Sequence, residues 1–477
     1  MAVWGTVGAL VGWLFEAPST EFCPDACARL VAELGGGDGV GSAGVVGQDL
    51  ALQAVTDAVC EHIALGGHAD RPLVLSFHGP VGVGKSLTQK AVAEALFGCR
   101  KGVGFESELE PVGPGGGYLS LAGTDWGAAD REVQATALAE RLARQVAVHP
   151  ASLVVVEDYD KMSCAARAVL RHAMDHGRVA HEVRARVKPT QAAGELAGGG
   201  EGRPFGGAVD TGLRSSGSSG RGAGASHGRF ARSILVLESN LGYSDLVGFM
   251  ADAGAGATRG ELSLVDAQRR LRDRVYAGWE AQACEDAGET HRSVSLVDFF
   301  VPFLPLERQH VRAVFAGQLG LRSMRGRMEG TWSALAWDDK VLDYLAANVE
   351  YEALAKKVHA AEDDADQGPS VPVAARAEIE FSLDGAREVR PVLTMLLGPA
   401  LRRAGVVHAS AQLAHGDAGR AQGRVVRLYV DPDAPAGLSA EIITQSPGSV
   451  PKPMIVPETR WWEDVIDLVD PRTNREL

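Results

Sequence analysis

The feature that most constrains the fold is one glycine-rich run, Gly79-Pro80-Val81-Gly82-Val83-Gly84-Lys85-Ser86. It follows an apolar segment at residues 73–78 and precedes a helix-like segment at residues 86–96. Strand, loop and helix in this order distinguish a phosphate-binding loop from a chance match to its pattern. The glycines let backbone N–H groups turn toward phosphate oxygens, and the helix N-terminus adds positive potential. The run therefore predicts an α/β nucleotide-binding domain.

The last two residues of the loop carry its chemistry. The Lys85 ammonium can reach the β- and γ-phosphates of ATP, and the Ser86 hydroxyl can ligate Mg²⁺. We therefore expect ATP and Mg²⁺ as the cofactors. The alternative is a glycine-rich turn without function, and the ordered strand and helix around the loop argue against it.

Polar side chains follow two further apolar strands. Residues 153–156 form an uninterrupted apolar run, typical of a buried parallel strand, and Glu157 and Asp158 follow it. Burying adjacent carboxylates is unfavourable unless a cation lies beside them. Phosphoryl transfer needs a carboxylate for Mg²⁺ and a group that orients the attacking water, which suits this pair. Asn240 follows the strand at residues 233–237 and is a candidate for contacting the γ-phosphate or the water, with an ordinary turn asparagine as the alternative.

The composition is that of a globular protein and argues against one class of partner. The 477 residues are enough for two or three domains, and 45% are hydrophobic and 23% charged. The net charge of −14 is opposite to the basic surface that nucleic-acid binding requires. We expect no nucleic-acid partner.

Shifts in composition predict the domain organisation. A stretch at about residues 188–228 is rich in Gly, Ser and Arg and has too few large apolar residues to offset the entropy of ordering, so it is predicted to be a disordered insertion. The predicted units are an apolar N-terminal segment with a Gly-rich linker (1–44), a large nucleotide-binding domain (45–315), a small lid domain (316–432) and a C-terminal tail (433–477).

The start of the chain has two open interpretations. Residues 2–15 carry no charge, yet they are fewer than the roughly 20 needed for a membrane-spanning helix. They also lack the basic leader of a secretory signal. Their two tryptophans suit peripheral association with a membrane interface, and a helix or strand packed on the main domain is the equal alternative.

The six cysteines show no metal-binding pattern. None forms a CxxC, and no His/Cys spacing suggests a zinc site. Cys23 and Cys27 lie four residues apart, and we favour two separate thiols over a disulfide between them.

Five stretches together resemble the torsins, which are Clp-related AAA+ ATPases of the endoplasmic reticulum and nuclear envelope. They are residues 47–51, 75–79 leading into the loop, 152–162, 237–240 and 296–307. The most specific is Leu296-Val297-Asp298-Phe299-Phe300-Val301-Pro302-Phe303-Leu304-Pro305-Leu306-Glu307. The resemblance covers about residues 45–180 and 230–315. It implies an AAA+ P-loop NTPase domain, with a parallel sheet flanked by helices, and a small, mostly helical C-terminal lid domain.

The resemblance also implies roles for single residues. Lys85 and Ser86 match Walker A, and Asn240 matches sensor 1. Glu157 and Asp158 fall on the Walker B pair in reversed order, so Glu157 would serve Mg²⁺ and Asp158 would polarise water. Aspartate is one methylene shorter than glutamate, and a misplacement of about 1 Å can cost about a hundredfold in rate. We expect slow hydrolysis, with complete loss of hydrolysis as the alternative.

Two positions bear on how the site is completed. Gly385-Ala386-Arg387 resembles the sensor 2 motif of Clp ATPases, which implies that Arg387 contacts the γ-phosphate, with a surface arginine as the alternative. Clp ATPases carry an arginine finger where this chain has Ser295 and Leu296, although Arg292 lies close by. Torsins also lack this finger, and a membrane-bound partner with an AAA+-like lumenal domain supplies it.

The resemblance implies a slow, torsin-like ATPase that such a partner activates. It would act as a homo- or hetero-oligomeric ring that remodels protein substrates or membrane assemblies in the endoplasmic reticulum lumen or nuclear envelope. One alternative is a self-sufficient Clp-type unfoldase or disaggregase, for which Trp126 is the candidate pore residue, although we favour a packing role for it. The other is a nucleotide-gated binding scaffold without hydrolysis, as the inverted Glu157-Asp158 pair suggests.

Overall fold

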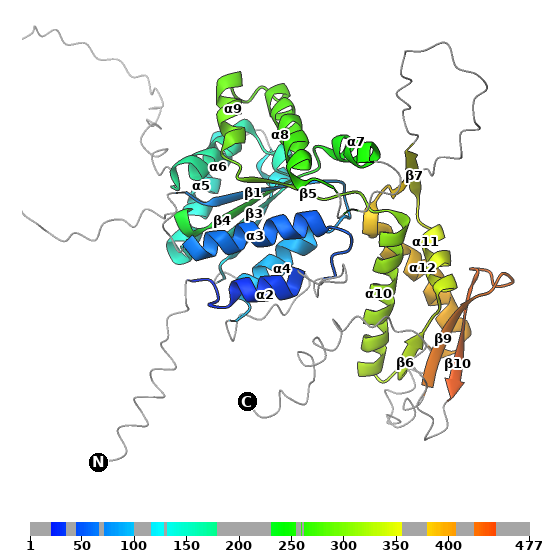
Figure 1. Cartoon of the computed structure of the whole chain (residues 1–477). Coiled ribbons are helices and arrows are strands. Elements are labelled where there is room, and N and C mark those ends of the chain that lie inside the picture. Colours follow the sequence, from blue (N-terminus) through cyan, green and yellow to red (C-terminus); the bar gives the residue numbers. More distant parts are fainter. Residues whose placement is uncertain are drawn as a thin grey trace, which may run out of the picture.

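The computed structural model forms a large α/β domain and a small domain joined after the fifth strand of the large domain's sheet (Figure 1). It describes residues 21–34, 44–65, 71–99, 116–127, 131–178, 230–253, 259, 262–354, 379–406 and 424–444. The predicted insertion at 188–228, the apolar segment at 2–15 and the tail beyond residue 444 lie outside these residues.

The large domain is built on a five-stranded sheet with the order β2-β3-β4-β1-β5. Every neighbouring pair of strands is parallel. The strands are β1 (Leu73–His78), β2 (Tyr118–Ala122), β3 (Leu153–Glu157), β4 (Ile234–Ser239) and β5 (Phe299–Pro302). The predicted parallel sheet is therefore confirmed, and each predicted apolar run forms a strand.

Alternating side chains bury both faces of this sheet. Leu75 and Phe77 pack on one face in a core shared with α2 (Ala26–Leu34), α3 (Asp49–Leu65) and α4 (Lys85–Phe97). Val74 and Val156 point to the opposite face. That face packs against α5 (Arg131–Val148), α6 (Cys164–His176), α7 (Tyr243–Ala253), α8 (Leu264–Ala281) and α9 (Ala287–Ser295). Figure 1 shows these two helical layers.

Helix α2 belongs to the large domain, although the sequence analysis placed residues 1–44 in an N-terminal segment and linker. Ala26, Leu30 and Leu34 are buried, and they lie four residues apart along one face of the helix. The helix packs against α3 and α4. The assignment of residues 21–34 to the N-terminal segment and linker is thus corrected, because the apolar face of this helix packs in the core of the large domain.

All six cysteines are paired in disulfides. The pairs are Cys23–Cys99, Cys27–Cys60 and Cys164–Cys284, with Cα–Cα distances of 5.9, 5.3 and 5.1 Å. The prediction of separate thiols at Cys23 and Cys27 is wrong, and these two cysteines are not bonded to each other. The paired cysteines are 76, 33 and 120 residues apart in the sequence. The fold brings them together, and no local spacing in the sequence predicts the pairs.

Removing the disulfide between α2 and α3 is expected to destabilise the large domain. It closes a chain separation of 33 residues, and loop-closure entropy for such a length corresponds to about 3–4 kcal/mol. We expect the Cys27→Ser/Cys60→Ser double variant to lose roughly this much free energy of unfolding in a denaturant titration. An unchanged midpoint of unfolding would contradict the pairing, as would a peptide map of the oxidised protein with other partners.

The small domain contains three helices and five short strands among its described residues. They are α10 (Arg308–Met328), α11 (Asp339–Ala347), α12 (Val389–Arg403), β6 (Ala334–Ala336), β7 (Tyr351–Leu354), β8 (Ile379–Ser382), β9 (Arg424–Val430) and β10 (Leu438–Thr444). The strands form a sheet of order β10-β9-β6 and a β7-β8 hairpin.

Two predicted domain limits fall inside this small domain or its first helix. Helix α10 continues across the limit at residues 315 and 316, and Val311, Phe315 and Leu319 are buried along one side of it. Strand β10 begins after the limit at residue 432 and pairs along its whole length with β9. The small domain thus begins at α10 and reaches at least Thr444.

Candidate nucleotide-binding site

The backbone of the Gly79–Ser86 loop has the shape that phosphate binding requires. Gly79, Gly82 and Gly84 have φ angles of 148°, 74° and 107°, in the region that other residues rarely adopt. A side chain at Gly79 would collide with the carbonyl of Phe303. Gly84 precedes α4 and has no side chain to cap it, so the first N–H groups of the helix are left for a ligand. The loop therefore fits a nucleotide phosphate.

The Lys85 side chain is almost fully buried at the centre of the loop, with 4% of the residue exposed. Its Nζ donates to the carbonyl oxygens of Gly79 at 2.8 Å and Pro80 at 2.7 Å, and to Asn240 Oδ1 at 3.0 Å. Burial lowers the pKa of Lys85, and the carboxylate of Glu238 partly offsets this effect. The ammonium is thus held at the carboxyl edge of the sheet, where the phosphates of a nucleotide would meet it.

Asn240 links Lys85 to Asp158. While its Oδ1 accepts from Lys85, its Nδ2 donates to Asp158 Oδ1 at 3.5 Å. Asp158 has a φ of 50°, which turns the chain sharply after β3. Its other oxygen accepts from Lys161 Nζ at 2.9 Å. The structure therefore brings three of the predicted site residues into one hydrogen-bonded chain, although their catalytic roles stay predictions.

The two predicted magnesium ligands come from the end of β3 and the start of α4. Glu157 ends β3, is partly buried, and accepts a hydrogen bond from Ser120 Oγ at 3.2 Å. Ser86 follows Lys85 in the first turn of α4 and is exposed. A carboxylate and a hydroxyl are both suitable oxygen ligands for Mg²⁺, so the donor chemistry fits the metal.

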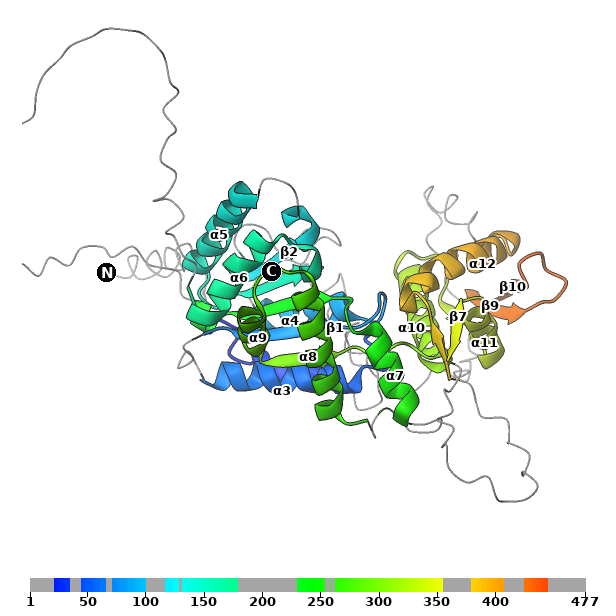
Figure 2. The ribbon, with the colours of Figure 1, turned by 90° about the horizontal axis from the view of Figure 1, so that it is seen from above.

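The predicted sensor 2 motif contacts the loop through its backbone. It lies in the short 3₁₀ helix η6 (Gly385–Glu388), where Ala386 N donates to Gly82 O at 2.8 Å. Side chains at Gly82 or Gly385 would collide across this contact. Arg387 is exposed, and its charge acts on Lys85 by lowering the pKa of the ammonium. The small domain thus reaches the carboxyl ends of the strands, as its position in Figure 2 indicates.

Arg292 is engaged within its own chain. It lies in α9, three residues before Ser295, and its Nη2 pairs with Asp175 of α6 at 2.5 Å. Trp126 lies in the 3₁₀ helix η1 (Gly123–Trp126) and is partly buried against the core on the α5–α6 face. That position agrees with the packing role favoured for Trp126.

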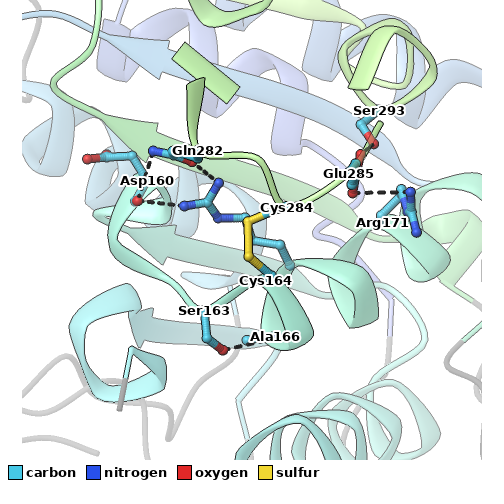
Figure 3. The surroundings of a disulfide bond; sticks show 10 residues. Asp160, Ser163, Cys164, Ala166, Arg171, Gln282, Cys284, Glu285 and Ser293 are labelled. Atoms are coloured by element: carbon cyan, nitrogen blue, oxygen red, sulfur yellow. Dashed lines mark hydrogen bonds and ion pairs between the residues drawn. A yellow bond between two sulfur atoms is a disulfide. The ribbon is translucent and has the colours of Figure 1, made fainter. Parts of the chain in front are cut away.

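A brace connects the turn after Asp158 to the segment between α8 and α9 (Figure 3). The Cys164–Cys284 disulfide joins α6 to that segment. Arg167, buried on α6, donates to the carbonyl of Asp160 at 2.6 Å and also to Gln282. This brace fixes the acidic end of β3 relative to α9.

Sequence reasoning missed four residues at the site. Ser120, Lys161 and Glu238 contact predicted site residues, and Gln89 contacts Glu238. Glu238 alone had a visible signal, because it is a carboxylate that continues the apolar run of β4. The other three are ordinary polar residues, and only the fold shows what they contact.

Comparison with known proteins shows a similarity to torsins around the phosphate loop. The torsin family model matches residues 21–108, which include α2 and the phosphate loop. A torsin-like protein of Drosophila melanogaster is 38% identical over 53 residues. The matches support a torsin assignment. At the level of the family, this torsin assignment supports an AAA+ ATPase.

The torsin similarity is local. The matched region is 11% of this chain and spans 16% of the length of the Drosophila protein. Among the residues that the structure describes, no helix combines the length and apolar character needed to cross a membrane.

Proposed function

We propose that this torsin-like chain binds ATP and Mg²⁺ at the Gly79–Ser86 loop, hydrolyses ATP slowly, and depends on a partner's arginine for faster turnover. The observation that carries the proposal is the hydrogen-bonded chain from the loop carbonyls through Lys85 and Asn240 to Asp158. It joins a phosphate-binding cation, a polar sensor and a candidate base at one edge of the sheet. The torsin assignment supports the same function at the level of the family.

Each residue has a task in this proposal. The loop N–H groups and Lys85 hold the phosphates, and Ser86 and Glu157 hold the metal. Bound Mg²⁺ would neutralise charge on the phosphates. Asp158 orients the attacking water, Asn240 holds Asp158 in place, and Arg387 approaches from the small domain.

The contacts of Asp158 support slow turnover. Its side chain is one methylene shorter than glutamate, and one carboxylate oxygen is already paired with Lys161. A short base that is held by another cation is poorly placed to reach a water at the γ-phosphate. The same contacts also suit the alternative of a nucleotide-gated scaffold without hydrolysis.

The position of Arg292 supports the proposal that a partner is needed. Its ion pair with Asp175 holds it on its own chain, and Ser295 and Leu296 offer no cation at the finger position. We propose that a membrane protein with an AAA+-like lumenal domain supplies the arginine, within a homo- or hetero-oligomeric ring. The packed position of Trp126 gives little support to the alternative of a self-sufficient, threading Clp-type unfoldase.

The disulfides support a lumenal compartment. Three disulfides that use every cysteine are typical of proteins in oxidising environments and rare in the cytosol. We therefore propose the endoplasmic reticulum lumen or nuclear envelope, where the ATPase would remodel protein or membrane assemblies. Peripheral membrane association through residues 2–15 remains part of this proposal.

Lengthening the candidate base tests the hydrolytic role directly. We expect Asp158→Glu to raise the turnover of the isolated chain about tenfold, because the added methylene brings the carboxylate nearer to the water. Asp158→Asn should remove turnover and leave ATP binding within about twofold, since it removes the base and keeps the shape. Phosphate release and nucleotide titration measure the two quantities.

The matched control is Asp433→Glu, an exposed position in the small domain. It should leave turnover unchanged. Equal turnover in the parent chain, Asp158→Glu and Asp158→Asn would reject Asp158 as the base. Tight ATP binding without turnover in any form, with or without a partner, would favour the scaffold.

A further inference from the structure

Glu238 is a carboxylate in a strand that is otherwise apolar up to that point. It lies in β4 opposite Phe77 of β1, and its side chain is 15% exposed. Val236, two residues earlier, packs in the core that contains α4, whereas Leu237 packs in the opposite core. Glu238 therefore points to the face that α4 covers.

Two side chains of α4 hold this carboxylate. Gln89 Nε2 donates to Glu238 Oε2 at 2.6 Å, and Lys85 Nζ lies 3.8 Å from Oε1. Lys85 and Gln89 are one helical turn apart, so Glu238 reaches the first turns of the helix that follows the phosphate loop. Among the described residues, Glu238 is the carboxylate with which the buried Lys85 ammonium forms an ion pair.

Further negative charge adjoins this ion pair. Val156 of β3 is aligned with Leu237 of β4. Glu157 and Glu238 are the next residues on these two adjacent strands, so they lie beside each other. Burial raises the pKa of Glu238, the nearby Lys85 and Gln89 act to lower it, and the charges of Glu157 and Asp158 raise it further. A nucleotide phosphate that approaches Lys85 thus meets Glu238 as well.

We propose that Glu238 is a positioning residue that competes with nucleotide phosphate for Lys85 and so makes ATP binding strongly dependent on Mg²⁺. The inference rests on the proposed nucleotide site. Free ATP brings more negative charge toward Glu238 than its magnesium complex does. Two like charges beside the same ammonium repel appreciably at the effective dielectric constant of a partly buried site. The carboxylate therefore weakens binding of the metal-free nucleotide more than binding of the complex.

The test compares ATP affinity with excess Mg²⁺ and with excess EDTA. A fluorescent ATP analogue is titrated into the full chain under both conditions. The readout is the dissociation constant in EDTA divided by the dissociation constant in Mg²⁺. Glu238→Gln keeps the shape and can still hydrogen-bond to Gln89, but it removes the charge. We expect this variant to lower the ratio by roughly tenfold, mainly through tighter binding of the metal-free analogue.

Two further variants separate charge from structure. Glu238→Asp keeps the charge and should retain most of the parent ratio, which a purely structural role would not predict. Glu441→Gln removes a charge from β10, where Glu441 pairs with Arg427, and should leave the ratio unchanged. Thermal unfolding of each variant confirms that the titrations are made on folded protein.

The outcomes distinguish this inference from the proposed function. If the parent chain binds the analogue and Glu238→Gln shows the same ratio, the role of Glu238 is wrong and the nucleotide site stands. A ratio that falls equally in Glu238→Asp and Glu238→Gln overturns the role of the charge. If the parent chain binds no nucleotide with or without Mg²⁺, the proposed function fails and this inference fails with it.

Discussion

Replacing Lys85 with alanine is expected to weaken ATP binding by roughly a hundredfold. The change removes a buried ammonium that donates hydrogen bonds to two loop carbonyls and to Asn240. Hydrogen bonds to charged groups contribute about 1.5–3 kcal/mol each, and about 1.4 kcal/mol is tenfold in affinity. A fluorescent nucleotide titration in Mg²⁺ measures the loss directly.

Two variants serve as controls for Lys85→Ala. Lys340→Ala removes an exposed lysine of α11 and should leave ATP affinity unchanged. Lys85→Ala also leaves Glu238 without its ion pair, so the Lys85→Ala/Glu238→Gln double variant removes both charges. It should recover thermal stability relative to Lys85→Ala and still bind ATP weakly. Unaltered affinity in Lys85→Ala would contradict the assignment of the loop.

A partner that supplies an arginine is expected to raise ATP turnover about a thousandfold. An arginine finger stabilises the charge that develops in phosphoryl transfer, and such fingers contribute about 10³–10⁵ in rate. This chain keeps Arg292 in an ion pair with Asp175, so its own site lacks that cation. Phosphate release by the chain, alone and with the lumenal domain of a candidate membrane partner, measures the effect.

The controls for activation lie on both proteins. An alanine in place of the partner's finger arginine should abolish the stimulation and preserve complex formation. Arg292→Ala in this chain should leave the stimulation intact, because the Arg292 side chain is paired with Asp175 of the same chain. Loss of stimulation in Arg292→Ala would show that this arginine acts across a subunit interface.

The large domain was predictable because its strands are short apolar runs that end in polar residues. Val154 and Val156 face one helical layer and Val155 faces the other, so an uninterrupted apolar run indicates a strand buried on both sides. The polar residues that follow, Glu157 and Asn240, both lie at the carboxyl edge of the sheet because parallel strands all end there.

The missed parts depend on contacts between distant segments. The Cys164–Cys284 pair spans 120 residues, and no spacing rule connects such partners. Helix α2 has apolar residues at helical spacing, but its glycine-rich flank suggested a linker. The small strands β6 and β10 become ordered through β9, which pairs with both of them. Glu238 is visible in the sequence as a carboxylate after an apolar run, but only the fold shows its contacts with Lys85 and Gln89, which lie about 150 residues earlier.

The central claim is that this chain binds ATP in a site that is incomplete for rapid hydrolysis. The most direct test measures ATP binding and phosphate release by the isolated, oxidised chain at saturating Mg²⁺ and ATP. We predict saturable binding with turnover slower than about one per minute. Turnover at or above about 1 s⁻¹ without a partner would contradict the account, as would the absence of any ATP binding.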